Sequence, residues 1–225
     1  MELRKVKIHR RQEKVSAVSQ ITLDDDYNVP DYRPDIVKVL KEKGELRFDE
    51  VTAGAGAAWV KGSLIFRILY RSEQSEGKIS CLRGEIPFQE KINVEGLQEY
   101  EKVQVGGEIE DLTIGVIHSR KLNVRAVVAL RVTVPEEVDE MLTTSMEDAE
   151  EYEQKTERWE ALSLISTVHD IGRQKSEVVL PSSKPNVREI LWRSMELRNV
   201  ECSLKDGRAM VGGEVLLSVL YSEEE

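Results

Sequence analysis

The three histidines are the first side chains to test for catalysis or metal binding, because imidazole serves both roles near neutral pH. His9 lies in a basic arm, His118 in a turn-like segment at 117–121, and His169 in the segment 167–170. None of them has another histidine or a cysteine at the spacing of a helical or Cys-x-x-Cys metal site. We therefore expect surface or turn histidines and predict no metal site.

Other motifs that could do chemistry have simpler interpretations. There is no Gly-x-Ser-x-Gly elbow for a nucleophilic serine. Gly54-Ala-Gly56 lacks the Lys-Ser/Thr ending of a phosphate loop, so a hairpin turn is expected there. The acidic run 136–157 lacks the spaced oxygen ligands and central glycine of a calcium loop. We predict no catalytic residue, no cofactor and no enzymatic activity.

Cysteine usage and the first residues indicate a reducing compartment. Cys81 and Cys202 lie far apart in segments that resemble strands, and buried free thiols are expected rather than a disulfide. Met1-Glu-Leu-Arg-Lys-Val-Lys7 opens on charge without an apolar stretch, so no signal peptide is predicted. No apolar run approaches the ~20 residues of a membrane helix. A cytoplasmic location without a membrane span is expected.

Charge is distributed unevenly along the chain. The formal net charge of -10 argues against nucleic acid as a partner. Positive charges gather at the N-terminus, in Arg4, Lys5, Lys7, Arg10, Arg11 and Lys14. Val6 and Ile8 alternate with them, which predicts a first strand with one solvated face; contact with anionic lipid or an acidic protein is the alternative. The acidic residues from 136 to 160 predict an exposed linker.

Most of the chain shows the period of two that is typical of β-strands. In residues 122–134, seven apolar side chains share one face, as in a half-buried antiparallel strand. Residues 63–70 are almost continuously apolar and predict a central strand buried on both faces. A change of phase soon after Gly106-Gly107 predicts a bulge or a kink. The predicted fold is all-β with a minor helix, arranged as an antiparallel β-sandwich-like domain.

One short helix is expected at residues 34–43. Pro34 stands where a first helical turn tolerates proline, and Gly44 stands where a helix commonly ends. Ile36, Val39 and Leu40 form an apolar stripe at helical spacing. The prediction is a helix packed on a face or an edge of the sheet.

An internal repeat organises the chain. Residues 30–74 match residues 181–225 without a gap, at a constant offset of 151. About 14 of these 45 positions are identical, where chance would give roughly two or three. We therefore predict a first domain at 1–135, an acidic linker at 136–160, and at 161–225 the N-terminal part of a second copy.

The second copy carries a strongly apolar strand. Its equivalents of residues 75–134 are missing from residues 1–225, so either the polypeptide continues and supplies them or another surface covers the strand. We predict that it docks on the first domain or pairs between chains, so that the protein self-associates. The residues expected to make this contact are Val215, Leu216, Leu217, Val219 and Leu220.

Three segments together resemble a known family. They are Pro30-Asp-Tyr-Arg-Pro-Asp-Ile-Val-Lys-Val-Leu40, Val60-Lys-Gly-Ser-Leu-Ile-Phe-Arg-Ile-Leu-Tyr70 and Glu85-Ile-Pro-Phe88. They resemble the SPOCS domain of SipL-like spore coat morphogenesis proteins, over roughly residues 20–134 and in part 181–225. The resemblance implies a non-enzymatic adaptor of endospore coat assembly in the mother-cell cytoplasm, at the outer forespore surface.

The resemblance also implies partners among the spore coat morphogenetic proteins, including an ATP-hydrolysing coat basement protein. In the family, contact with that protein is attributed largely to a LysM domain, and no LysM-like segment occurs in residues 1–225. The alternative is a carbohydrate- or envelope-binding β-sandwich without a sporulation role. Clustered exposed Trp and Tyr would favour it, but Trp59, Trp159 and Trp192 lie in separate segments.

Overall fold

A computed structural model describes residues 2–73, 78–147, 155, 157, 158, 160–169 and 171–223. These residues form eight strands and no helix. The strands are β1 (Glu2–Asn28), β2 (Ile36–Gly54), β3 (Ala57–Ser72), β4 (Ile79–Asn93), β5 (Gln104–His118), β6 (Lys121–Glu147), β7 (Val187–Lys205) and β8 (Arg208–Glu223). The predicted all-β class is confirmed.

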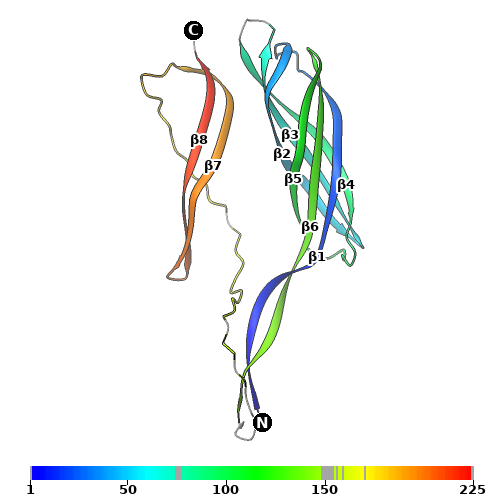
Figure 1. The fold of residues 1–225 in the computed structure, drawn as a ribbon, viewed down its shortest axis with the longest axis vertical. Helices are drawn as coiled ribbons and strands as arrows, with labels where there is room; N and C mark the ends of the chain where they lie inside the picture. Colours follow the sequence, from blue (N-terminus) through cyan, green and yellow to red (C-terminus); the bar gives the residue numbers. More distant parts are fainter. Residues whose placement is uncertain are drawn as a thin grey trace.

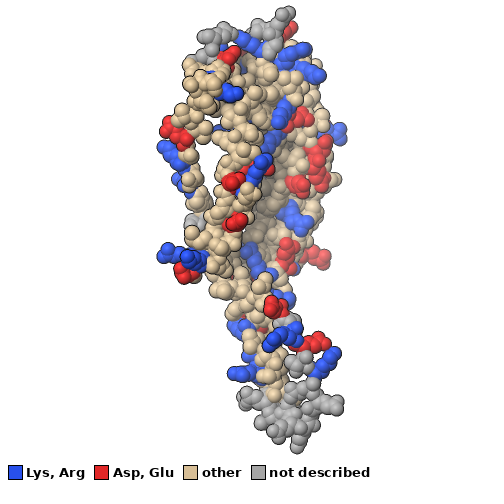
Figure 2. Space-filling view, turned by 60° about the vertical axis from the view of Figure 1, so that its left-hand side comes forward, with Lys and Arg blue, Asp and Glu red and all other residues tan. Residues whose placement is uncertain are grey.

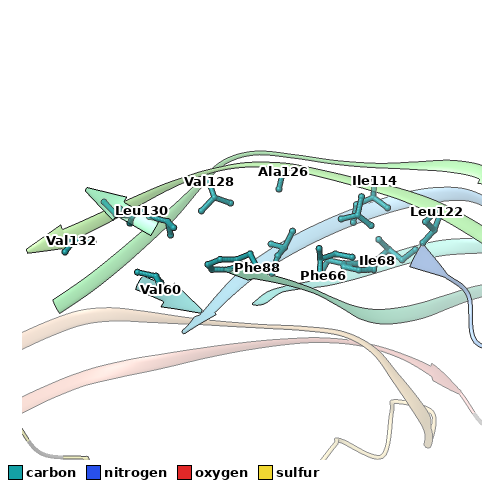
Figure 3. Close-up of a cluster of buried hydrophobic side chains, with 14 of the residues drawn as sticks. Val60, Phe66, Ile68, Phe88, Ile114, Leu122, Ala126, Val128, Leu130 and Val132 are labelled. Atoms are coloured by element: carbon teal, nitrogen blue, oxygen red, sulfur yellow. The ribbon is translucent and has the colours of Figure 1, made fainter. Parts of the chain in front are cut away.

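The first six strands form a two-layer sandwich. One sheet has the order β1-β6-β5 and the other β2-β3-β4, with antiparallel pairing throughout. Apolar side chains of the two sheets point toward one another between the layers (Figure 3). The hairpin β7–β8 is a separate two-stranded sheet that lies beside the sandwich (Figure 1).

The two central strands are those with the clearest sequence patterns. On β6, the side chains from Leu122 to Val134 that share one face are all buried in the core. On β3, Phe66 and Ile68 face the core while Ile65 and Leu69 are buried on the opposite side. β3 pairs with β2 on one edge and with β4 on the other, so it is the central strand of its sheet. Both predictions are confirmed.

The helix predicted at 34–43 is wrong, because these residues open strand β2. Register shifts between Ile36 and Lys38 and between Val39 and Lys41 each insert one extra residue into the strand. The two bulges turn Ile36 and Val39 toward the core, whereas Leu40 stays 49% exposed. A strand with two closely spaced bulges thus produces the three-residue spacing that resembled a helical stripe.

Gly44 has a different role from the expected helix stop. It lies inside β2, where a Cβ atom would come 2.7 Å from Cδ1 of Ile109 on the facing sheet. The glycine therefore allows the two sheets to approach closely. A register shift on β5 between Ile109 and Asp111 confirms the bulge predicted soon after Gly106-Gly107.

The acidic segment is strand where the sequence indicated a linker. β6 continues to Glu147 and pairs with the basic N-terminal half of β1, so residues 136–147 lie in a two-stranded ribbon. In this ribbon, Lys7 forms an ion pair with Asp139 at 2.6 Å and Arg10 one with Glu140 at 3.3 Å. Opposite charges across neighbouring strands stabilise their pairing. Of the predicted linker residues 148–160, most lie outside the described residues.

Candidate interaction surface

The β7–β8 hairpin reproduces the β2–β3 hairpin residue for residue. Each strand begins and ends at the offset of 151 that relates the two sequence copies. The first two bulges of β2 recur on β7 at the same offset, between Val187 and Glu189 and between Ile190 and Trp192. The two sequence copies therefore share the same strands and the same two bulges, and neither contains the helix that was expected in both.

Turn contacts recur at the same offset. The hydroxyl of Tyr70 donates to the Pro34 carbonyl oxygen at 3.1 Å, and that of Tyr221 donates to the Pro185 carbonyl oxygen at 3.3 Å. The turns that join the strands each contain a glycine with positive φ, Gly56 and Gly207. Equal positions in the two copies can therefore be compared directly.

The hairpin exposes the face that forms the core in the first copy. Leu64, Phe66 and Ile68 of β3 are fully buried there. Their equivalents Val215, Leu217 and Val219 are 59%, 51% and 43% exposed. Val211 and Tyr221, the equivalents of Val60 and Tyr70, lie on the same face. We call these five β8 residues the exposed core face.

The structure divides the residues predicted for self-association between two sides of β8. Val215, Leu217 and Val219 belong to the exposed core face, whereas Leu216 and Leu220 point to the opposite side, as Ile65 and Leu69 do on β3. Sequence reasoning identified the apolar strand, but it did not separate its two faces. The repeat could have separated the two faces, because each β8 residue lies on the same side of its strand as the β3 residue 151 positions earlier.

The hairpin contacts the first domain through β7. Arg33 pairs with Glu189 at 3.1 Å, and the ammonium of Lys41 lies 5.1 Å from the ring centroid of Trp192. β8 pairs with β7 alone among the described strands. The exposed core face thus has no covering element in the part of the chain that the structure describes.

The histidines lie in three separate places. His9 is in the β1–β6 ribbon and hydrogen-bonds the carboxylate of Asp139. At the turn after β5, the backbone N–H of Arg120 donates to Nδ1 of His118 at 3.2 Å. His169 is exposed in the segment before β7. No cluster of three or more potential metal ligands occurs among the described residues.

Both cysteines are free thiols in strands, as predicted, but their environments differ. Cys81 on β4 is half-buried, and burial raises the pKa of its thiol above the ordinary value, with a further contribution from the carboxylate of Glu189. Cys202 on β7 is exposed, where a buried thiol was expected. A raised pKa leaves the Cys81 thiol protonated at neutral pH and disfavours reaction at this position.

The other proposed chemical motifs also have structural roles. Gly54 closes β2 and Gly56 lies in the turn before β3, so the hairpin turn predicted there is confirmed. Trp59 on β3 and Trp192 on β7 lie in different sheets, and Lys91 stacks 5.7 Å from the centroid of Trp59. No helix of the described residues is long and apolar enough to cross a membrane.

Comparison with known proteins identifies the central part of the sandwich. Residues 35–117 match the family model described as SipL, SPOCS domain. The match begins one residue before β2 and ends one residue before the end of β5, so it spans β2 to β5. No curated protein and no solved structure matches the chain. Residues 35–117 therefore belong to the SPOCS domain family of SipL, as the sequence pattern indicated.

Proposed function

We propose that this protein is a non-enzymatic adaptor of endospore coat assembly that acts through protein–protein contacts. The SPOCS match supports a sporulation-related role. The observation that supports action through protein–protein contacts is the exposed core face of β8, because the equivalent residues in the first copy are buried. Large apolar faces of this kind mark protein interaction sites or aggregation liabilities. A protein contact on this face would remove it from water.

The proposed location is the mother-cell cytoplasm at the outer surface of the forespore. The proposed partners are spore coat morphogenetic proteins, together with a second copy of this chain through β8. In an endospore-forming host, a fluorescently tagged protein should form a shell around the forespore. A diffuse signal throughout sporulation would contradict the adaptor role.

A pair of variants tests whether the exposed core face carries this role. Leu217→Gln places an amide on that face, and Leu216→Gln makes the same change on the opposite side of β8. We expect Leu217→Gln to reduce recovery of coat proteins with the tagged chain, whereas Leu216→Gln retains most of it. Equal recovery with both variants would show that the contact lies outside the exposed core face. Because the two leucines are similarly exposed, their effects on folding should match.

A further inference from the structure

Three cations stand in one row across the outer side of the β2-β3-β4 sheet. Lys43 on β2 is directly opposite Arg67 on β3, which is directly opposite Arg83 on β4. Like charges directly opposite one another on neighbouring strands are destabilising. The row therefore opposes pairing of the sheet unless an anion compensates it. We call these three residues the cation row.

The compensation available within the described residues is incomplete. Glu45 lies 3.6 Å from Lys43 and 3.8 Å from Arg67, and it is the carboxylate that forms ion pairs with the row among the described residues. Both distances are at the long end for an ion pair, and Arg83 has no ion-pair partner among the described residues. Glu85, two residues from Arg83 on β4, pairs with Arg47 instead. One carboxylate of the described residues thus pairs with two of the three cations, so the row is only partly compensated in a protein whose net charge is -10.

The second copy shows that the fold does not require these cations. At the offset of 151, Lys43 corresponds to Ser194 and Arg67 to Ser218, and these serines are directly opposite each other on β7 and β8. The same hairpin therefore forms with a neutral pair at this position. A row that the fold does not need and that weakens sheet pairing is better explained by a ligand than by stability.

The row lies beside a cleft that collects further cations. Between the sheet and β7, a cleft of about 270 Å³ is lined by arginines 33, 67, 83 and 193, with Ile190, Leu191 and Trp192 supplying apolar surface. Nε of Arg33 is buried and has no hydrogen-bond partner among the described residues. Glu189 balances one of these charges. Figure 2 shows that basic and acidic side chains are interspersed over the face of the molecule in that view.

We propose that the cation row and this cleft bind an acidic peptide segment of a protein partner, with an apolar or aromatic side chain against Trp192. Guanidinium groups recognise carboxylates through paired N–H donors, which suits a cleft rich in arginine. The apolar part of the lining favours a peptide that carries an apolar side chain over a nucleic acid. The inference rests on the proposed adaptor role and specifies the chemistry of the partner.

The test measures binding of a fluorescein-labelled peptide of sequence EELFEE to the full chain by fluorescence anisotropy. Lys43→Ser/Arg67→Ser introduces the residue pair of the second copy, and Arg83→Gln removes the unpaired cation. We expect each variant to bind about tenfold more weakly or worse. Since a repulsive row is removed, the melting temperature should stay equal or rise. The control, Arg125→Ser/Arg131→Ser, removes two exposed cations from β6 on the other sheet and should bind normally.

Four results would overturn the proposal. The row variants could bind the peptide like the original chain, or the β6 control could lose binding equally, which would indicate nonspecific attraction. Inorganic phosphate or oligo-dT could displace the peptide at equal concentration, which would assign the site to another anion. A fall of several degrees in melting temperature would make the row structural. If the row variant still localises normally in cells, the adaptor role stands and this inference fails. If the chain binds the peptide but does not localise to the forespore, the peptide site stands and the adaptor role fails.

Discussion

Self-association through the exposed core face is the prediction that the structure makes most sharply. Val211, Val215, Leu217 and Val219 are between 43% and 71% exposed, although their equivalents in the first copy are fully buried. We expect two chains to bring these faces together, because this removes apolar surface from water. Leu217→Gln should weaken the association, and Leu216→Gln, on the other side of β8, is the matched control.

The expected affinity follows from the exposed fraction. Full burial of one such side chain contributes about 1.5–3 kcal/mol, so a half-exposed one still offers about 0.7–1.5 kcal/mol. Four side chains from each of two chains offer about 6–12 kcal/mol, and association costs at least about 4 kcal/mol. A net gain of about 2–8 kcal/mol corresponds to a Kd between about 30 mM and 1 µM, and its midpoint of about 5 kcal/mol corresponds to a Kd of about 0.2 mM. Leu217→Gln acts twice in the dimer and should raise this Kd about tenfold to a hundredfold.

Sedimentation velocity between about 10 µM and 1 mM brackets the Kd of about 0.2 mM at the midpoint of this range. Residues 1–225 should shift toward dimer across this range, whereas residues 1–147, which contain the complete first sandwich, should stay monomeric. A chain of 225 residues that remains monomeric at the highest concentration with Leu217 accessible to solvent would refute the reasoning. Association of residues 1–147 alone would refute it as well.

Two further predictions concern the first domain. A methyl group added by Gly62→Ala would run into the carbonyl oxygen of Arg47 and should destabilise the domain by about 1–3 kcal/mol. At the equivalent Gly213, a Cβ lies 3.3 Å from the corresponding carbonyl oxygen, so Gly213→Ala should cost less than about 0.5 kcal/mol; equal losses in chemical denaturation would contradict the comparison. Hydrogen bonds from Ser119 and then Arg120 lower the pKa of Asp35 below 3.8. Because the folded pKa is the lower one, this carboxylate stabilises the fold above pH 3.8 and loses that effect as the pH falls through the folded value. In the Asp35→Asn variant, the melting temperature should therefore decrease less steeply below about pH 4 than in the original chain. An equal decrease in both proteins would show that Asp35 does not contribute to acid sensitivity.

The strands and the repeat could be predicted from the sequence because their signals are local. Residues 122–134 carry seven apolar side chains at period two, and this pattern predicts a strand with one buried face. The constant offset of 151 was likewise found from the sequence alone. It implies that β8 residues share a face in the same alternation as their equivalents on β3. The sequence also showed that no familiar catalytic motif is present. That the protein is not an enzyme stays a prediction.

Residues 36–43 show where local signals failed. Pro34, Gly44 and a three-residue apolar spacing all favoured a helix. Pairing with β3 imposed a strand, and two bulges reconciled the spacing with a buried face. Neither bulge has a local signature, because a bulge is defined by the register of the partner strand.

Charge placement was decided by the tertiary structure in the same way. The basic arm and the acidic run are more than a hundred residues apart in sequence, yet they are neighbours in the β1–β6 ribbon, where Lys7 and Arg10 form ion pairs with Asp139 and Glu140. Lys43, Arg67 and Arg83 were unremarkable in sequence and became a row across three strands. Periodicity is a property of one segment and can be read from it. Register between segments depends on which strands pair, and only the folded chain determines that.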